Sequence, residues 1–308
     1  MSTEIGNESV VVSEEVEQAV RDGAPVVALE STIFSNLGLP SPDNLEAYRR
    51  CTAAIRDGGA VPAMTTVLDG KGRVGIDEGE LERVLTCSRK VASRELPVAI
   101  GLGWDAGDTT VSASLALASV VGIEVFATGG VGGVPRGSEI TGDISADLDA
   151  LARYPVACVS AGAKAFLDLA RTLEYLETAG VPVIGYRTDH FPAFYTRSSG
   201  LHLPIQVESA SEAASIIRAG AAVGHTGGVL IAVPIPETDE LDPARLDEAL
   251  KAALHEADVT GLAGPTVTPF VLGRIMNATD GQSVPANLAL AENNAAVAAG
   301  IAVELSRT

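Results

Sequence analysis

The stretch YPVACVSAGAKAFLDLARTLEYLETAGVPVIGY, residues 154–186, holds the pattern that decides the fold. Two short apolar runs, 154–162 and 180–186, flank the segment 165–180, whose apolar residues recur at helical spacing. Runs of this kind are typical of strands buried on both faces, and a helix between two such strands joins them in parallel. The stretch therefore predicts a strand–helix–strand unit.

The same alternation continues through most of the chain, and the C-terminal third is mostly helical in pattern. Further strands are predicted at 24–30, 60–68, 95–102, 122–130 and 227–236. Further helices are predicted at 41–59, 77–88, 109–122 and 145–154. We expect a three-layer α/β/α sandwich around a largely parallel sheet. We expect residues 1–308 to form a single α/β domain, with about residues 1–17 as a candidate loose N-terminal segment.

Composition and charge narrow the class of protein. A hydrophobic content of 46% indicates a sizeable core, and a net charge of −19 makes a nucleic acid an unfavourable partner. Apolar runs stay shorter than the ~20 residues that span a bilayer, and the acidic N-terminus does not resemble a signal peptide. Cys51, Cys87 and Cys158 are odd in number and widely spaced, which indicates neither a disulfide framework nor a zinc site. We expect a cytoplasmic protein without a membrane partner.

Lys164 stands out because only four of the 21 basic residues are lysines. Arginine supplies surface charge but stays protonated, whereas a lysine amine can lose its proton and attack a carbonyl carbon. The structural alternative is a first-turn helix residue that reaches into solvent.

Glu30 ends the predicted strand 24–30, and the glycines of 129–133 begin at the end of the predicted strand 122–130. Active sites of such folds lie beyond the carboxyl ends of the strands. Each has a structural alternative, a solvated strand end for Glu30 and a tight turn for the glycines. Together, a lysine and a carboxyl group suit imine chemistry at the anomeric carbon of a sugar, with the carboxyl group moving the proton.

Other motifs in the sequence suggest different chemistry. The run GLGWDA, 101–106, fits a dinucleotide fingerprint, but its aspartates would repel a pyrophosphate and no acid follows at the right strand end, so we reject it. Scattered histidines and the absence of G-x-S-x-G give no support for a hydrolase triad. In TGDISADLDAL, Ser145 suits a helix N-cap, and Asp143 and Asp147 could face Mg²⁺ or Mn²⁺.

Long motifs in this sequence resemble those of the pseudouridine-5′-phosphate glycosidase family, from about Val16 to the C-terminus. They include VVALESTIFS, GAVPAMTTVLDG, VFATGGVGGVPRG, DISADLDALA, SAGAKAFLDLARTLEYLETAGVPVIGY, FPAFYTRSSG, TPFVLGR and NLALAENNA. The resemblance implies an α/β/α sandwich, a homotrimer, a bound Mn²⁺ (or Mg²⁺) and no organic cofactor. It also implies a reversible reaction that joins C1 of ribose 5-phosphate to a carbon of uracil.

The resemblance also implies roles for individual residues. Lys164 matches the nucleophile that forms the imine, Glu30 the proton donor, and Asn287 a residue close to the reacting centre. Asp143 matches the metal-site aspartate. The substrate-binding positions fall on Lys90, Val111, Ser145, Ala146 and Asp147.

Several positions outside this set depart from the family pattern. The segment FSNLG at 34–38 lacks a histidine, Pro135 replaces a histidine, Gly142 an aromatic residue and Val233 an asparagine; GWDAGDTTV also differs. Lost hydrogen-bonding groups weaken the recognition of a polar base. On this basis we expect a C-glycosynthase that attaches ribose 5-phosphate to an aromatic natural product, similar to alnumycin-type C-ribosylation. The alternatives are a catabolic pseudouridine-5′-phosphate glycosidase and a catalytically silent ribose-phosphate-binding protein.

Overall fold

The computed structural model describes residues 7–262 and 267–307. The strands are β1 (Val10–Val12), β2 (Val26–Leu29), β3 (Val61–Leu68), β4 (Lys71–Val74), β5 (Lys90–Val91), β6 (Ala106–Thr109), β7 (Val125–Ala127), β8 (Ala157–Ser160), β9 (Val183–Tyr186), β10 (Gln206–Val207) and β11 (Leu230–Ala232). The helices are α1 (Glu14–Arg21), α2 (Asp43–Asp57), α3 (Glu78–Leu85), α4 (Leu96–Gly101), α5 (Val111–Val120), α6 (Ser138–Thr141), α7 (Ala146–Arg153), α8 (Leu169–Thr178), α9 (Ala210–Ala222), α10 (Pro243–Val259), α11 (Val267–Ala278) and α12 (Ser283–Ser306).

The strands of the described residues form one sheet in the order β1-β4-β3-β2-β7-β8-β11-β9-β10, with β6 beside β3 and β5 beside β6. The run from β3 through β2, β7, β8 and β11 to β9 is parallel throughout, and β3 pairs antiparallel with β4 and β6. The predicted, largely parallel α/β/α architecture is confirmed. Because parallel strands end at the same edge, the residues that follow β2, β7 and β8 meet there.

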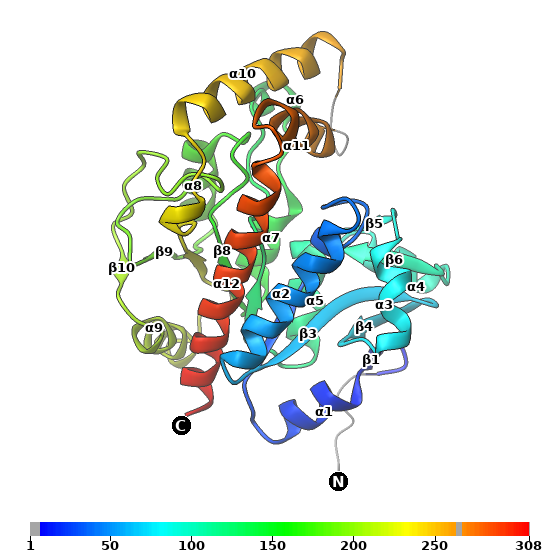
Figure 1. Cartoon of the computed structure of the whole chain (residues 1–308). Coiled ribbons are helices and arrows are strands. Elements are labelled where there is room, and N and C mark those ends of the chain that lie inside the picture. The colour runs from blue at the N-terminus through cyan, green and yellow to red at the C-terminus, as the bar shows by residue number, and fades with distance from the viewer. Residues whose placement is uncertain (1–6, 263–266, 308) are drawn as a thin grey trace.

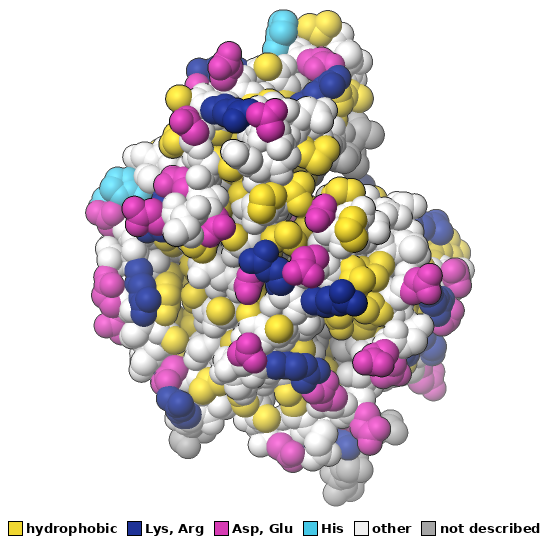
Figure 2. Space-filling view, in the orientation of Figure 1, with side chains coloured by type: hydrophobic (Ala, Val, Ile, Leu, Met, Phe, Trp, Pro, Cys, Tyr) yellow, Lys and Arg dark blue, Asp and Glu magenta, His cyan; other side chains and the backbone are white. Residues whose placement is uncertain are grey.

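Helices cover both faces of this sheet. α2, α12 and α9 lie together on one face, and α5 and α7 lie on the other (Figure 1). By length and composition α12 could cross a membrane, but its buried residues pack against β2, β7, β8 and α2, which makes it a core helix. On the face that carries α12, basic side chains alternate with acidic ones over the surface (Figure 2).

One predicted strand is wrong, because 95–102 contains the helix α4. Pro97 lies in the first turn, where the missing N–H costs no hydrogen bond, whereas a central strand would need that donor. A short apolar run does not by itself distinguish a buried strand from a buried helix. Within the part of the chain that the structure describes, the sequence prediction also missed five short strands: β1, β4, β5, β6 and β10.

The candidate loose segment, about residues 1–17, overlaps β1 and the start of α1. Val10 to Val12 pair in parallel with β4, and Val16 is buried. From Asn7 onward this part of the chain is thus integrated with the sheet.

The contact between α12 and the end of α2 leaves no spare volume. A Cβ atom built on Gly58 would lie 2.6 Å from the Cβ of Ala299, which is fully buried. We expect Ala299→Leu to lower the free energy of unfolding by ~1–3 kcal/mol through overpacking, measured by chemical denaturation.

The neighbouring Gly300 is the control for this substitution. A Cβ at Gly300 would lie 3.5 Å from the Cβ of Ala210, an ordinary contact, so Gly300→Ala should raise stability by up to ~1 kcal/mol through helix propensity. Unchanged stability in Ala299→Leu would contradict this packing.

Candidate active site

Residues that follow three parallel strands, β2, β7 and β8, converge at the carboxyl edge of the sheet, where helix α12 contributes Asn287. Glu30 directly follows β2, Thr128 directly follows β7, and Lys164 lies four residues beyond β8. Lys164 is held in the loop before α8 by a hydrogen bond from its backbone N–H to the Val131 carbonyl at 3.1 Å. Since α8 begins only at Leu169, the first-turn helix alternative for Lys164 is wrong.

Glu30 is a buried carboxyl group among other charged groups. Its side chain accepts a hydrogen bond from the Thr128 hydroxyl. Burial raises the pKa of Glu30 from 4.5 to about 7; the positive charges of Lys164 and Lys90 and the Thr128 hydrogen bond oppose the rise, while Asp147 adds to it. A carboxyl group in this pKa range can both give and take a proton near neutral pH.

Lys90, on β5, lies at the rim of the same cluster. Desolvation first, and then repulsion from Lys164, lower its pKa, while Asp147 and Glu30 counteract the effect. Lys90 and Lys164 therefore share one electrostatic environment with Glu30, as expected if all three contact one substrate.

Asp147 links the first turn of α7 to two neighbouring segments. Its carboxylate accepts hydrogen bonds from the backbone N–H groups of Ser112 at 3.0 Å and Gly132 at 2.9 Å. Ser145 caps α7, as predicted, by accepting a hydrogen bond from the Asp147 N–H at 3.3 Å. A Cβ at Gly132 would lie 2.1 Å from the Ser145 hydroxyl oxygen, so the close approach of this loop requires glycine there.

The remaining predicted residues lie on adjoining elements. Val111 and Ala146 are the first residues of α5 and α7, whose N-terminal ends the Asp147–Ser112 bond brings together. Asn287 projects from α12, and its side-chain oxygen is buried without a hydrogen-bond partner among the described residues.

Of the two aspartates predicted to face a metal ion, only Asp143 has a carboxylate free of backbone hydrogen bonds among the described residues. Asp143 is exposed, whereas both carboxylate oxygens of Asp147 are engaged by backbone amides, so the two carboxylates do not form a joint pair of ligands. The described ranges contain no cluster of three or more His, Cys, Asp or Glu side chains suited to a metal. A single exposed carboxylate suits a hydrated ion shared with a substrate phosphate rather than a tightly held resident ion.

Sequence reasoning missed Thr128, Asn294 and Asp108. Thr128 lies near the end of the predicted strand 122–130 and directly follows the observed strand β7, so its position was a usable signal. Asn294 lies within a helix, and Asp108 lies on the unpredicted strand β6; burial raises the pKa of Asp108 to about 7. The rejected GLGWDA run ends α4 and leads into β6, the reverse of the strand-to-helix order that a dinucleotide fingerprint needs.

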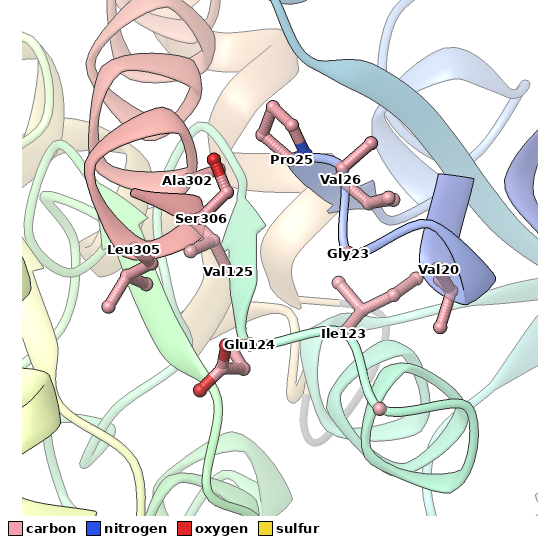
Figure 3. Close-up of a pocket in the computed structure, with 12 residues that line it drawn as sticks. Val20, Gly23, Pro25, Val26, Ile123, Glu124, Val125, Ala302, Leu305 and Ser306 are labelled. Carbon is pink, nitrogen blue, oxygen red and sulfur yellow. The ribbon is translucent and has the colours of Figure 1, made fainter. Parts of the chain in front are cut away.

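A surface hollow of about 310 Å³ lies at the opposite edge of the sheet. Pro25 and Val26 at the start of β2, Glu124 and Val125 at the start of β7, and Ser306 at the end of α12 line it (Figure 3). Because Glu30 and Lys164 follow the carboxyl ends of their strands, this hollow is separate from the candidate active site.

Comparisons with known proteins confirm the resemblance seen in the motifs. Residues 15–304 match the family described as "Indigoidine synthase A like protein". A pseudouridine-5′-phosphate glycosidase of Caldanaerobacter subterraneus subsp. tengcongensis is 51% identical over 303 residues, 98% of each chain. One from Methylobacterium nodulans is 50% identical over 94% of this chain and 86% of its own length.

Two solved structures share the fold. The prealnumycin C-glycosynthase AlnA, in complex with ribulose 5-phosphate, is 36% identical with a TM-score of 0.90 over 98% of each chain. An indigoidine synthase A-like protein from Thermotoga maritima is 34% identical with a TM-score of 0.88 over 99% of this chain and 100% of its own.

The expectation of an aromatic C-glycosynthase is wrong, because the relatives that share about half of their residues with this chain are pseudouridine-5′-phosphate glycosidases. The departures behind that expectation do not share one environment. Gly142 is an exposed residue with φ of +69°, and Asn36 is exposed with its amide donating to the Thr86 carbonyl at 3.0 Å. Val233 is buried in the core, and Pro135 is half-buried. The loss of hydrogen-bonding groups at these positions does not by itself identify the aglycone.

The burial of Glu30 predicts a specific pH dependence of stability. Between pH 4.5 and 7 the unfolded chain ionises Glu30 while the folded chain keeps it protonated, so this group lowers stability as pH rises through that window. The difference amounts to about 3 kcal/mol. We therefore expect the free energy of unfolding of the wild type, measured relative to that of Glu30→Gln in denaturant titrations, to fall by about 3 kcal/mol between pH 4 and pH 8. Parallel pH curves for the two proteins would rule out a buried, proton-binding Glu30.

Proposed function

The chain belongs to the indigoidine synthase A-like family of enzymes, and on that premise we propose that it is a pseudouridine-5′-phosphate glycosidase. Its reaction would break, with water, the carbon–carbon bond between C1 of ribose 5-phosphate and uracil, and would form that bond in reverse. The observation that carries the proposal is the cluster of Glu30, Lys164 and Lys90 at the carboxyl edge of the sheet, in a chain about half identical to such glycosidases.

Lys164 is the nucleophile in this proposal. Its unprotonated amine attacks C1 of the sugar, and the ring oxygen leaves and takes a proton as the ring opens. The electron pair of the carbon–carbon bond then stays with the uracil carbon, and C1 becomes the carbon of an imine with Lys164. Water hydrolyses the imine to ribose 5-phosphate and restores the lysine.

Glu30 supplies the proton that the departing uracil carbon needs. The raised pKa keeps a protonated fraction available near neutral pH, and the Lys164 charge stabilises the carboxylate left after transfer. Asn287, whose buried side-chain oxygen has no partner in residues 7–262 and 267–307, would accept a hydrogen bond from an N–H of the base.

The sugar phosphate would lie between Lys90 and the first turns of α5 and α7, where Val111, Ser145 and Ala146 lie. Helix N-termini and a lysine favour an anion. Asp143 would hold a hydrated Mn²⁺ or Mg²⁺ whose chemistry is to neutralise phosphate charge. A homotrimer and a cytoplasmic location are further parts of the proposal, the first testable by light scattering.

Trapping with borohydride tests the role of Lys164. Reduction in the presence of ribose 5-phosphate should fix the sugar on Lys164, detected by peptide mass spectrometry. Lys164→Arg keeps the positive charge but cannot form the imine, so we expect a loss of activity of at least ~10³-fold.

Lys71→Arg is the matched control. Lys71 is an exposed residue of β4, away from the candidate site, and its ammonium group donates a hydrogen bond to the Glu8 carbonyl. The Lys71→Arg enzyme should retain full activity. A label on Lys90 alone, or an active Lys164→Arg enzyme, would refute the assignment. A catalytically silent binding protein would bind ribose 5-phosphate without any covalent label.

Metal removal tests the role of Asp143. Exhaustive chelation should reduce turnover, and Mn²⁺ or Mg²⁺ should restore it in the wild type. Asp143→Asn should raise the metal concentration needed for half-maximal activity. Turnover that is indifferent to chelation would show that Asp143 holds no required ion.

A further inference from the structure

Asn294 is a buried amide in an alanine-rich part of α12. Its side chain is fully buried, with Ala291, Ala295 and Ala298 buried around it on the same helix. A buried amide is unfavourable unless it is hydrogen bonded. The Asn294 Nδ2 atom donates to the carbonyl oxygen of Thr128 at 2.8 Å and to that of Gly129 at 3.3 Å.

These bonds fix a residue that touches Glu30. The backbone N–H of Thr128 donates to the Val159 carbonyl at 3.0 Å, its carbonyl accepts from Asn294, and its hydroxyl donates to the Glu30 carboxylate. Because β7 ends at Ala127, the Thr128 carbonyl lies beyond the regular strand. Asn294 therefore holds the peptide that carries the hydroxyl.

The side chain of Asn294 is only partly satisfied. Its Oδ1 atom is buried without a hydrogen-bond partner among the described residues, and so is that of Asn287, seven residues earlier on α12. An alanine at position 294 would avoid this unpaired oxygen and would favour the helix, but it would also leave the Thr128 and Gly129 carbonyls without this donor. The amide therefore serves the backbone at the end of β7.

We propose that Asn294 is a positioning residue of the active site, which holds the Thr128 hydroxyl on the Glu30 carboxylate. The proposal rests on the proposed function for its kinetic consequences. Asn294 does not touch the reacting atoms and acts only through Thr128.

The electrostatic consequence has a definite sign. A hydroxyl that donates to a carboxylate stabilises the ionised form, so its loss raises the pKa of Glu30 further. The other charged groups that act on Glu30 are Lys164, Lys90 and Asp147, and the proposed variants leave all of them in place.

The first measurement follows Glu30 directly in the free enzyme. Isotope-edited infrared or NMR titration of carboxyl groups, with Glu30→Gln to assign the signal, should show the Glu30 transition at higher pH in both Thr128→Val and Asn294→Ala. Thr128→Ser keeps the hydroxyl and should restore the wild-type transition.

Asn293→Ala is the matched control. Asn293 is the adjacent asparagine on α12, and its amide donates to the Pro234 carbonyl at 3.3 Å instead. It should leave the Glu30 transition unchanged. The near-isosteric Thr128→Val provides the test if Asn294→Ala does not fold.

The second measurement is the pH profile of kcat/KM with pseudouridine 5′-phosphate. Because Glu30 acts in its protonated form, the alkaline limb should move to higher pH in Thr128→Val and Asn294→Ala, with kcat reduced about tenfold or more and KM changed less. If no variant cleaves this substrate but the Glu30 transition still moves, the proposed function fails and the positioning role stands. An unmoved transition in a folded Asn294→Ala protein would overturn the positioning role.

Discussion

The candidate active site depends on the burial of one carboxyl group, that of Glu30, at the carboxyl edge of a parallel sheet. A carboxylate removed from water is costly, so burial raises the pKa of Glu30 to about 7 even though neighbouring charges and a hydrogen-bond donor oppose the rise. Lys164, Lys90 and Thr128 supply that opposition, and none of them could do so from another edge of the sheet. The parallel register brings Leu29 beside Ala127, so the residues that follow β2 and β7, Glu30 and Thr128, become neighbours.

Residues distant in the sequence maintain this edge. The Asp147 carboxylate ties the first turn of α5 to the glycine-rich loop after β7, and Asn294 on α12 ties the end of β7 from the other face of the sheet. Hydrogen bonds from both helical layers thus fix the end of the sheet at the candidate active site. Asp147 and Asn294 satisfy backbone hydrogen-bonding groups there, and Asp147 also adds a negative charge near Glu30.

Much of this arrangement could be predicted from the sequence, for identifiable reasons. Apolar runs mark buried strands, and a charged residue just beyond such a run is visible as a candidate, which is how Glu30 and Lys164 were found. The rest depends on tertiary structure.

The contact between Thr128 and Glu30 could not be predicted, because it depends on the pairing of β2 with β7. The role of Asn294 could not be predicted either, because the sequence of α12 does not show which strand end the helix packs against. The helix α4 was mistaken for a strand because its short apolar run fits both structures. The aglycone could not be predicted from Pro135, Gly142, Val233 and the altered segment 34–38, because the loss of a hydrogen-bonding group does not show which molecule the site accepts.

The most direct test of the central claim follows the reaction products. Pseudouridine 5′-phosphate is incubated with the enzyme in D₂O and observed by ¹H and ³¹P NMR. We predict equal amounts of uracil and ribose 5-phosphate, with one deuterium on the uracil carbon that carried the sugar and no such exchange in uracil incubated without enzyme. Release of inorganic phosphate, or an unchanged substrate in the presence of Mn²⁺, would contradict the account.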